Sequence, residues 1–141
     1  MILHQARRER MRVKQVSIFV ENQPGRLSEV LATLARENIN IRALAVADSA
    51  DFGILRLILS DVDRGVKALR DAGWSVRTTD VLQVEMPDVP GGLNDTLVKP
   101  LAAAGVNIEY IYAHILPSPG KATVLVKVRD IEKAEKALGL A

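Results

Sequence analysis

Apolar and polar residues alternate early in the chain, and the alternation then gives way to a helical spacing. Val16, Ile18 and Val20 recur with period two, which predicts a strand with one buried face. Polar residues and a Pro-Gly pair interrupt this pattern at 21–25. An amphipathic helix is expected next, because the following apolar residues have the spacing i, i+3, i+4, i+7: Leu27, Val30, Leu31 and Leu34.

Two more strands are expected after this helix. Asn38 is a suitable helix end, since Asn tolerates the left-handed backbone conformation. The runs 39–47 and 52–59 are rich in residues that favour strands, and the polar segment 48–51 between them is typical of a turn. The two strands should therefore pair as a hairpin.

A second helix should complete this part of the chain. Asp61 can cap it, Ala72-Gly73 ends it, and Trp74 begins a short fourth strand. The order strand, helix, strand, strand, helix, strand is the split β-α-β arrangement of ferredoxin-like folds. We therefore predict an α+β protein whose antiparallel sheet carries both helices on one face.

The pattern then repeats. Ile39-Asn40-Ile41 returns as Val106-Asn107-Ile108, and Asp61-Val62 returns as Asp130-Ile131. The Pro-Gly segment returns as well: Pro24-Gly25-Arg26-Leu27 recurs as Pro90-Gly91-Gly92-Leu93. Matches in the same order indicate two structural units. We expect a flexible arm over 1–13, a first repeat over 14–79 and a second over 80–141.

Two departures from the repeat are informative. The second repeat has one extra residue before Leu101, and Pro100 lies inside the same expected helix. This combination predicts a kink or a π-bulge. The sequence also stops at Ala141, where the fourth strand of the second repeat should begin. That repeat is expected to lack its own last strand, so its sheet edge is bare, or is filled by another chain or another part of this one.

Composition narrows the function. Hydrophobic residues make up 48% of the chain but aromatic residues only 4%, so the core must be aliphatic. The net charge is +2, and much of the basic excess lies in the first fourteen residues, so the rest of the chain is roughly balanced in charge. This balance argues against a nucleic-acid surface. The expected strands also lack the aromatic residues on which bases stack in RNA-binding domains. Without cysteine there is no disulfide or thiol nucleophile, and no apolar run approaches the length of a membrane span. We expect a cytoplasmic protein.

No catalytic or metal-binding pattern stands out. His4 lies in the arm and His114 in an expected strand, where packing or an interface contact is its ordinary role. The carboxylate pair Asp61 and Asp63 lies at a helix start, and the pair Asp48 and Asp51 at a turn, where capping explains them. Neither catalytic residues nor a metal nor a cofactor is expected.

The Pro-Gly loops are the best candidate sites. Each leads into the start of a helix, where unpaired N–H groups and a partial positive charge favour carboxylates or phosphates. Asn22 and Asp88 lie just before the glycines and can accept hydrogen bonds from an ammonium group. Together these features fit a free amino acid, although a tight turn that needs glycine is the structural alternative. Asn40 and Asn107 either close onto the loops or satisfy a strand end.

At these residues the chain resembles the ACT domain, twice over. The resemblance covers about 14–79 and 80–138, and it implies a small-molecule sensor, usually of amino acids, with ligands at the interface between paired sheets. The positions that match the family's site are Asn22, Gln23, Pro24, Gly25, Arg26, Leu27, Asn40, Ile41, Asp88, Val89, Pro90, Gly91, Gly92, Leu93, Asn107 and Ile108.

The resemblance also implies a mode of action. With no enzyme domain attached, a bound amino acid would act in trans, through assembly or contacts with a regulated enzyme. A homodimer or a higher homo-oligomer is expected. The apolar residues around the loops favour an aliphatic ligand. The alternative from a different class is a ligand-free dimerisation or protein-interaction module, in which the Pro-Gly loops are only structural.

Overall fold

The computed structural model describes residues 12–48, 52–115 and 118–140. Most of the expected arm, the turn at 49–51 and its carboxylate Asp51, and part of the β5–β6 connection lie outside the described residues. The chain divides into two compact units. The first unit is Lys14–Thr79, and the second comprises the described residues from Asp80 onward together with Arg12 and Val13.

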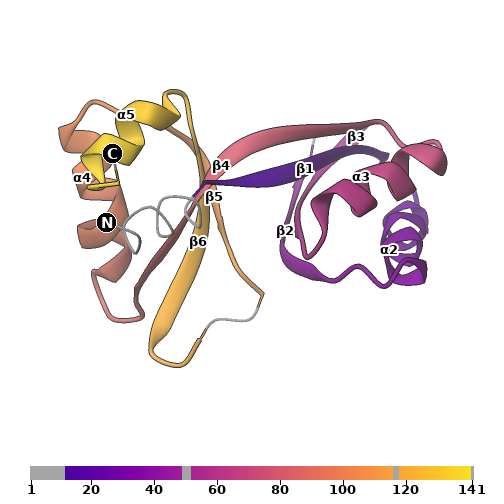
Figure 1. Cartoon of the computed structure of the whole chain (residues 1–141), viewed down its shortest axis with the longest axis horizontal. Coiled ribbons are helices and arrows are strands. Elements are labelled where there is room, and N and C mark those ends of the chain that lie inside the picture. The colour runs from indigo at the N-terminus through magenta and orange to yellow at the C-terminus, as the bar shows by residue number, and fades with distance from the viewer. Residues whose placement is uncertain (1–11, 49–51, 116–117, 141) are drawn as a thin grey trace. The chain divides into compact units, whose positions relative to one another are not determined.

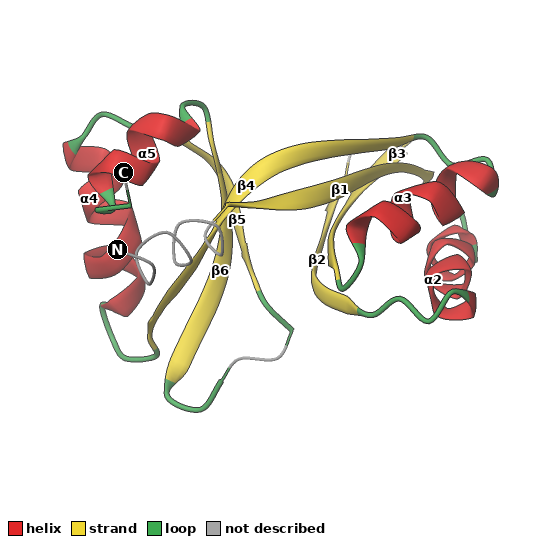
Figure 2. Cartoon of the chain, viewed as in Figure 1, coloured by secondary structure: helices red, strands yellow, loops and turns green. Residues whose placement is uncertain are grey.

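The first unit has the predicted ferredoxin-like order (Figure 1). Its strands hydrogen-bond in the order β2-β3-β1-β4, and Figure 2 shows both helices on one side of them. Its elements are β1 (Arg12–Glu21), α2 (Arg26–Arg36), β2 (Ile41–Asp48), β3 (Phe52–Leu59), α3 (Val62–Asp71) and the beginning of β4 (Val76–Pro87).

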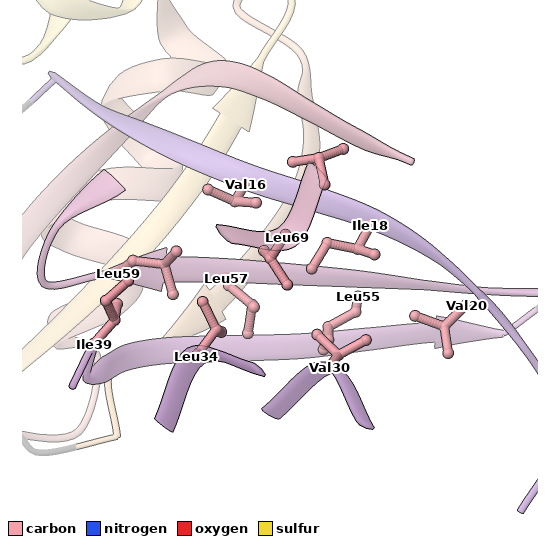
Figure 3. Packing of buried hydrophobic residues seen from close by; sticks show 11 residues of the cluster. Val16, Ile18, Val20, Val30, Leu34, Ile39, Leu55, Leu57, Leu59 and Leu69 are labelled. Atoms are coloured by element: carbon pink, nitrogen blue, oxygen red, sulfur yellow. The ribbon is translucent and has the colours of Figure 1, made fainter. Parts of the chain in front are cut away.

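The alternation in β1 sets the core of the first unit. Val16, Ile18 and Val20 are buried, and they face aliphatic side chains of α2 and α3 such as Leu34 and Leu69 (Figure 3). The core is aliphatic, as composition predicts, with Trp74 packed at its margin. Burying such side chains is the main stabilising term for a unit of this size.

The ends of the helices were predicted from single residues. Asn38 has a φ of 57°, the left-handed conformation that terminates α2. Asp61 caps α3, because its carboxylate accepts a hydrogen bond from the Arg64 backbone N–H at 3.2 Å. The expected hairpin is confirmed too, since β2 and β3 pair antiparallel with Ala45 opposite Arg56.

The second unit has the same plan on β4, β5 and β6, with its helices on one side of the strands (Figure 2). Buried aliphatic residues such as Leu82, Leu101 and Val126 form its separate core. Beyond β4, its elements are a π-helical segment η1 (Asn94–Val98), α4 (Lys99–Ala103), β5 (Ile108–Ala113), β6 (Lys121–Val128) and α5 (Ile131–Ala137).

The extra residue of the second repeat is accommodated as a π-helix. The segment Asn94–Val98 winds with the wider π geometry, and Pro100 follows in the first turn of α4. The helical backbone is continuous here, since Leu93, Val98 and Lys99 all have the right-handed helical conformation, so Pro100 removes an N–H from the interior of a helix, beside the wider π turn. The predicted π-bulge is therefore confirmed, and the core residues Leu97 and Leu101 stay fully buried on either side of the change.

The two repeats are joined by one continuous strand around residue 80. The short fourth strand of the first repeat and the first strand of the second repeat form the single strand β4, Val76–Pro87. No glycine or proline lies between Arg77 and Asp80, and the extended backbone continues through this segment.

The start of β1 takes the place of the missing fourth strand in the second unit. β1 neighbours β4 in the sheet, and its first residues, Arg12 and Val13, belong to the second unit. The Arg12 guanidinium also forms an ion pair with Glu135 of α5, in the same unit. Of the alternatives for this sheet edge, the structure thus shows another part of the same chain.

The last helix is shorter than its counterpart. α3 has ten residues and α5 has seven. Equivalent backbone hydrogen bonds end them: Trp74 N donates to Leu69 O, and Leu140 N donates to Glu135 O. Glu135 therefore occupies the position of Leu69, a fully buried core residue of the first unit.

Candidate ligand-binding loops

The first Pro-Gly loop is a tight, exposed turn between β1 and α2. The Gln23 N–H donates to Glu21 O at 2.8 Å, and the Arg26 N–H donates to Gln23 O at 3.3 Å. Gly25 has a φ of 87°, in the left-handed region that favours glycine, and it provides no side-chain cap for the helix. The side chains from Asn22 to Pro24 are exposed. This helix start is therefore open to a ligand's acceptor atoms.

Arg26 gives the first loop a cation that is already paired. Its guanidinium lies 3.2 Å from the Glu29 carboxylate and 3.7 Å from that of Glu21. All three side chains are well exposed, so each contact adds little stability. A ligand carboxylate at this loop would rely on backbone N–H groups unless it displaced one of these carboxylates from Arg26.

The second loop is tied to the β5–β6 connection. The Asp88 N–H donates to Gly120 O at 3.1 Å, and the Gly92 N–H donates to Val89 O at 3.0 Å. Gly92 is buried, and a Cβ at this position would lie 2.4 Å from the carbonyl oxygen of Pro87. The close approach explains why glycine occupies the place of Arg26. The two loops are thus not equivalent, as the sequence indicates.

An apolar side chain stands exposed beside each loop. Leu27 was expected to line the buried face of its helix, but it is 39% exposed, and its counterpart Leu93 is 43% exposed. Both lie at helix starts, before the first buried core residues, Val30 and Leu97. In the second loop, Val89 is also exposed. Each loop therefore combines polar groups with an aliphatic surface.

The Asn-Ile pairs lie at the other end of each sheet. In the first unit, Ile41 pairs with Leu59, whereas the loop follows Glu21, which pairs with Phe52 at the opposite end of β3. Asn40 exchanges hydrogen bonds with Ser60 instead: its N–H donates to Ser60 Oγ at 2.9 Å, and its own carbonyl accepts from the Ser60 N–H at 2.9 Å. Asn40 thus satisfies a strand end.

The second unit has the same arrangement. Ile108 pairs with Val128, whereas Pro87, just before the second loop, pairs with Lys121 at the opposite end of β6. Asn107 accepts a long hydrogen bond from the Arg129 N–H at 3.5 Å. Within each unit the structure therefore brings together the loop residues, but not the Asn-Ile pair with them.

The sheet face opposite the helices of the second unit carries residues that sequence reasoning missed. On β5, Tyr110 and Tyr112 stack with ring centroids 6.4 Å apart, although aromatic platforms were thought to be missing from these strands. His114 Nε2 lies 3.2 Å from Gln83 Oε1, so its imidazole reaches from the end of β5 to β4. The period-two spacing of Tyr110, Tyr112 and His114 was the available signal.

The described residues contain neither a metal-binding cluster nor a helix that could span a membrane. In them, no three His, Asp or Glu side chains gather closely enough to hold a metal ion. The helices of residues 12–48, 52–115 and 118–140 are all too short or too polar to cross a bilayer. The polar side chains buried in the described part of the chain all have hydrogen-bond partners.

A family model and solved structures both match nearly the whole chain. The family model for the ACT domain pair matches residues 11–139. The structure of protein BT0572 from Bacteroides thetaiotaomicron is 46% identical, with a TM-score of 0.85 over 92% of this chain and 88% of that one. The regulatory subunit of aspartate kinase from Thermus thermophilus has the same fold at 20% identity, with a TM-score of 0.69 over 92% and 91%. A search of curated proteins found no match. The chain belongs to the ACT domain pair family.

Proposed function

We propose that this protein binds a free amino acid at its Pro-Gly loops and regulates a partner in trans. One observation carries the proposal: both units present an exposed loop at a helix start, with a leucine exposed beside it. In this proposal the repeats over 14–79 and 80–141 are the two binding modules, the protein is cytoplasmic, and it has no catalytic activity of its own.

The chemistry of the loops matches the three parts of an amino acid. Backbone N–H groups at the helix start can bind the carboxylate. The exposed side chains of Asn22 and Asp88 can accept hydrogen bonds from the ammonium group. Leu27 and Leu93 offer an aliphatic contact, which favours a ligand with an aliphatic side chain.

The name of one structural neighbour supports regulation in trans. The Thermus thermophilus protein is a regulatory subunit of aspartate kinase, and this chain covers 91% of its length. A chain of this size can thus serve as a regulatory subunit. By analogy, ligand binding would favour one state of a homodimer, or of a complex with an enzyme, through differential affinity.

The alternative function is a ligand-free interaction module. Its support is the apolar surface on the outermost strands: Val46 of β2 is 58% exposed and Ile111 of β5 is 38% exposed. In this alternative, a second copy of the chain covers those strands, and the loops have only a structural role.

The deciding experiment is thermal unfolding in the presence of each of the twenty free amino acids. A ligand at a hundredfold excess over its Kd adds about 2.7 kcal/mol, which shifts the midpoint by several degrees. Stabilisation by aliphatic amino acids supports the full proposal, whereas stabilisation by polar ones alone rejects the aliphatic ligand. If no amino acid shifts the unfolding midpoint, the interaction module is favoured.

Loop variants localise the response. Asn22→Leu combined with Asp88→Leu should abolish the shift, because both ammonium acceptors are removed from exposed positions. Thr78→Ala, an exposed substitution in β4 away from the loops, is the matched control and should keep it. If the amino acid stabilises the loop variant and the control equally, it binds elsewhere.

A further inference from the structure

A groove on the helical side of the first unit lies outside the loops considered above. It has a volume of about 360 Å³ and is open to solvent. One wall is a face of α2, and the other is the connection from α3 to β4. The lining residues are Ser28, Glu29, Ala32, Thr33, Arg36, Ala72 and Trp74.

The apolar side of the groove is held in place. Trp74 packs partly against the core of the first unit, and its backbone N–H donates to Leu69 O at 3.0 Å. Ala72 is anchored in the same way, by a hydrogen bond from its N–H to Ala68 O at 3.1 Å. With Ala32 on the facing helix, these residues offer a flat apolar contact of fixed geometry.

The polar side of the groove holds one carboxylate, Glu29, and one cation, Arg36. Glu29 is paired with Arg26 at 3.2 Å. Arg36 donates one hydrogen bond, to Thr33 Oγ1 at 3.3 Å, and among the described residues no carboxylate lies within ion-pair distance of its guanidinium. Thr33 is itself fixed, because its hydroxyl donates to Glu29 O at 2.9 Å. Arg36 therefore keeps most of its donors available.

The second unit does not reproduce this chemistry. Leu34 corresponds to Leu101, so Thr33 and Arg36 correspond to Pro100 and Ala103. The equivalent helix-ending hydrogen bonds place Leu140 where the first unit has Trp74, and Leu140 is buried. The cation and the aromatic ring thus occur together only in the first unit, and the shared fold does not require them.

We propose that this groove binds a small monocarboxylate with a flat apolar body. The carboxylate is held by the Arg36 guanidinium, and the apolar body lies against Trp74 and Ala32. This site is distinct from the Pro-Gly loops, since its charged anchor is a side chain near the C-terminal end of α2. The protein would therefore respond to two ligands rather than one.

Phenylacetate is a suitable probe, and Trp74 reports on it directly because it is the only tryptophan in the chain. The fluorescence of Trp74 should change as phenylacetate is added and should reach a plateau at millimolar concentrations. Arg36→Gln should weaken the response at least tenfold, whereas Lys67→Gln, which removes an exposed cation of α3 outside the groove, should not. Phenethylamine and 2-phenylethanol, which lack the carboxylate, should give no saturable response. An equal response in the Arg36 variant, a response to the amine, or no response to phenylacetate overturns the proposal.

A second pair of variants does not depend on removing Arg36. Ala32→Glu places a carboxylate four residues before Arg36 on the same helix, where it would occupy the guanidinium, so phenylacetate should no longer bind. Ala32→Gln is the size-matched control and should retain binding; equal binding by both variants contradicts the proposal. The Asn22→Leu, Asp88→Leu variant should keep the phenylacetate response while losing the amino-acid response, so failure at one site is distinguishable from failure at the other.

Discussion

Arg12, in β1, and Glu135, in α5, form an ion pair across 123 positions of the chain. Glu135 replaces the aliphatic residue found at this position in the first unit, Leu69, and its side chain is only 6% exposed. Its hydrogen bond to Arg12 raises the pKa of the guanidinium above its already high ordinary value. Arg12 therefore stays charged through the neutral pH range, and its titration should not make stability vary there.

The two members of this pair should respond unequally to substitution. Arg12→Met leaves a buried carboxylate without its partner and should lower the free energy of unfolding by about 1–3 kcal/mol. Glu135→Leu should cost less, because the Arg12 side chain is 37% exposed and can be hydrated. Urea unfolding of both variants measures the difference. If Glu135→Leu lowers the free energy of unfolding more than Arg12→Met does, the argument from the buried carboxylate and its partly hydrated partner is wrong.

The glycines of the Pro-Gly loops should differ in their tolerance of a methyl group. In Gly25→Ala, the added Cβ has no atom within 4 Å, so only the positive φ is unfavourable. The free energy of unfolding should fall by about 1 kcal/mol. Gly92→Ala places a Cβ 2.4 Å from Pro87 O, a backbone atom, and should cost about 3 kcal/mol because the loop must move. Thermal unfolding of the two variants tests this order; equal losses would contradict the close approach.

The caps of α3 and α5 should contribute similar stability. The Asp61 carboxylate accepts from Arg64 N at 3.2 Å, and that of Asp130 accepts from Lys133 N at 3.1 Å. Replacing either aspartate by Ala should cost about 1 kcal/mol, whereas Asn, which also caps helices, should cost much less. Chemical denaturation compares the two substitutions at each site. If Asn is as costly as Ala, charge rather than capping stabilises the helix start.

The leucines beside the loops should matter for binding more than for folding. Leu27→Ser and Leu93→Ser change exposed side chains, so unfolding free energies should fall by less than about 1 kcal/mol. Leu34→Ala, in the core, should cost about 2–5 kcal/mol. Under the proposed function, the two serine variants should weaken stabilisation by an aliphatic amino acid. If the amino acid shifts the unfolding midpoint of the serine variants as much as that of the unchanged protein, these leucines do not contact the ligand.

Local features of the fold were accessible from sequence. Asn38, Asp61 and the extra residue near Pro100 each determine the backbone within one or two helical turns, so each could be interpreted without knowing the rest of the structure. The ferredoxin-like order follows from hydrophobic periodicity, which depends only on neighbouring residues.

Non-local features were less accessible. Nothing near Arg12 indicates that the start of β1 completes the second unit, because the contact joins distant segments. Apolar spacing predicted that Leu27 faces the core, but periodicity gives the direction of a side chain and not where the packed surface ends. For the same reason, sequence could not show that Asn40 lies away from the loop, since the strand pairing sets that distance.

The Arg12–Glu135 contact also affects how the protein can be made. During synthesis, the first unit has all of its strands once residues around Val76 have emerged. The start of β1 emerges earlier still, but its partner in α5 is added 123 residues later. β4, which lies beside β1 in the sheet, emerges well before α5, so the ion pair between Arg12 and Glu135 is among the last contacts to form in the described chain.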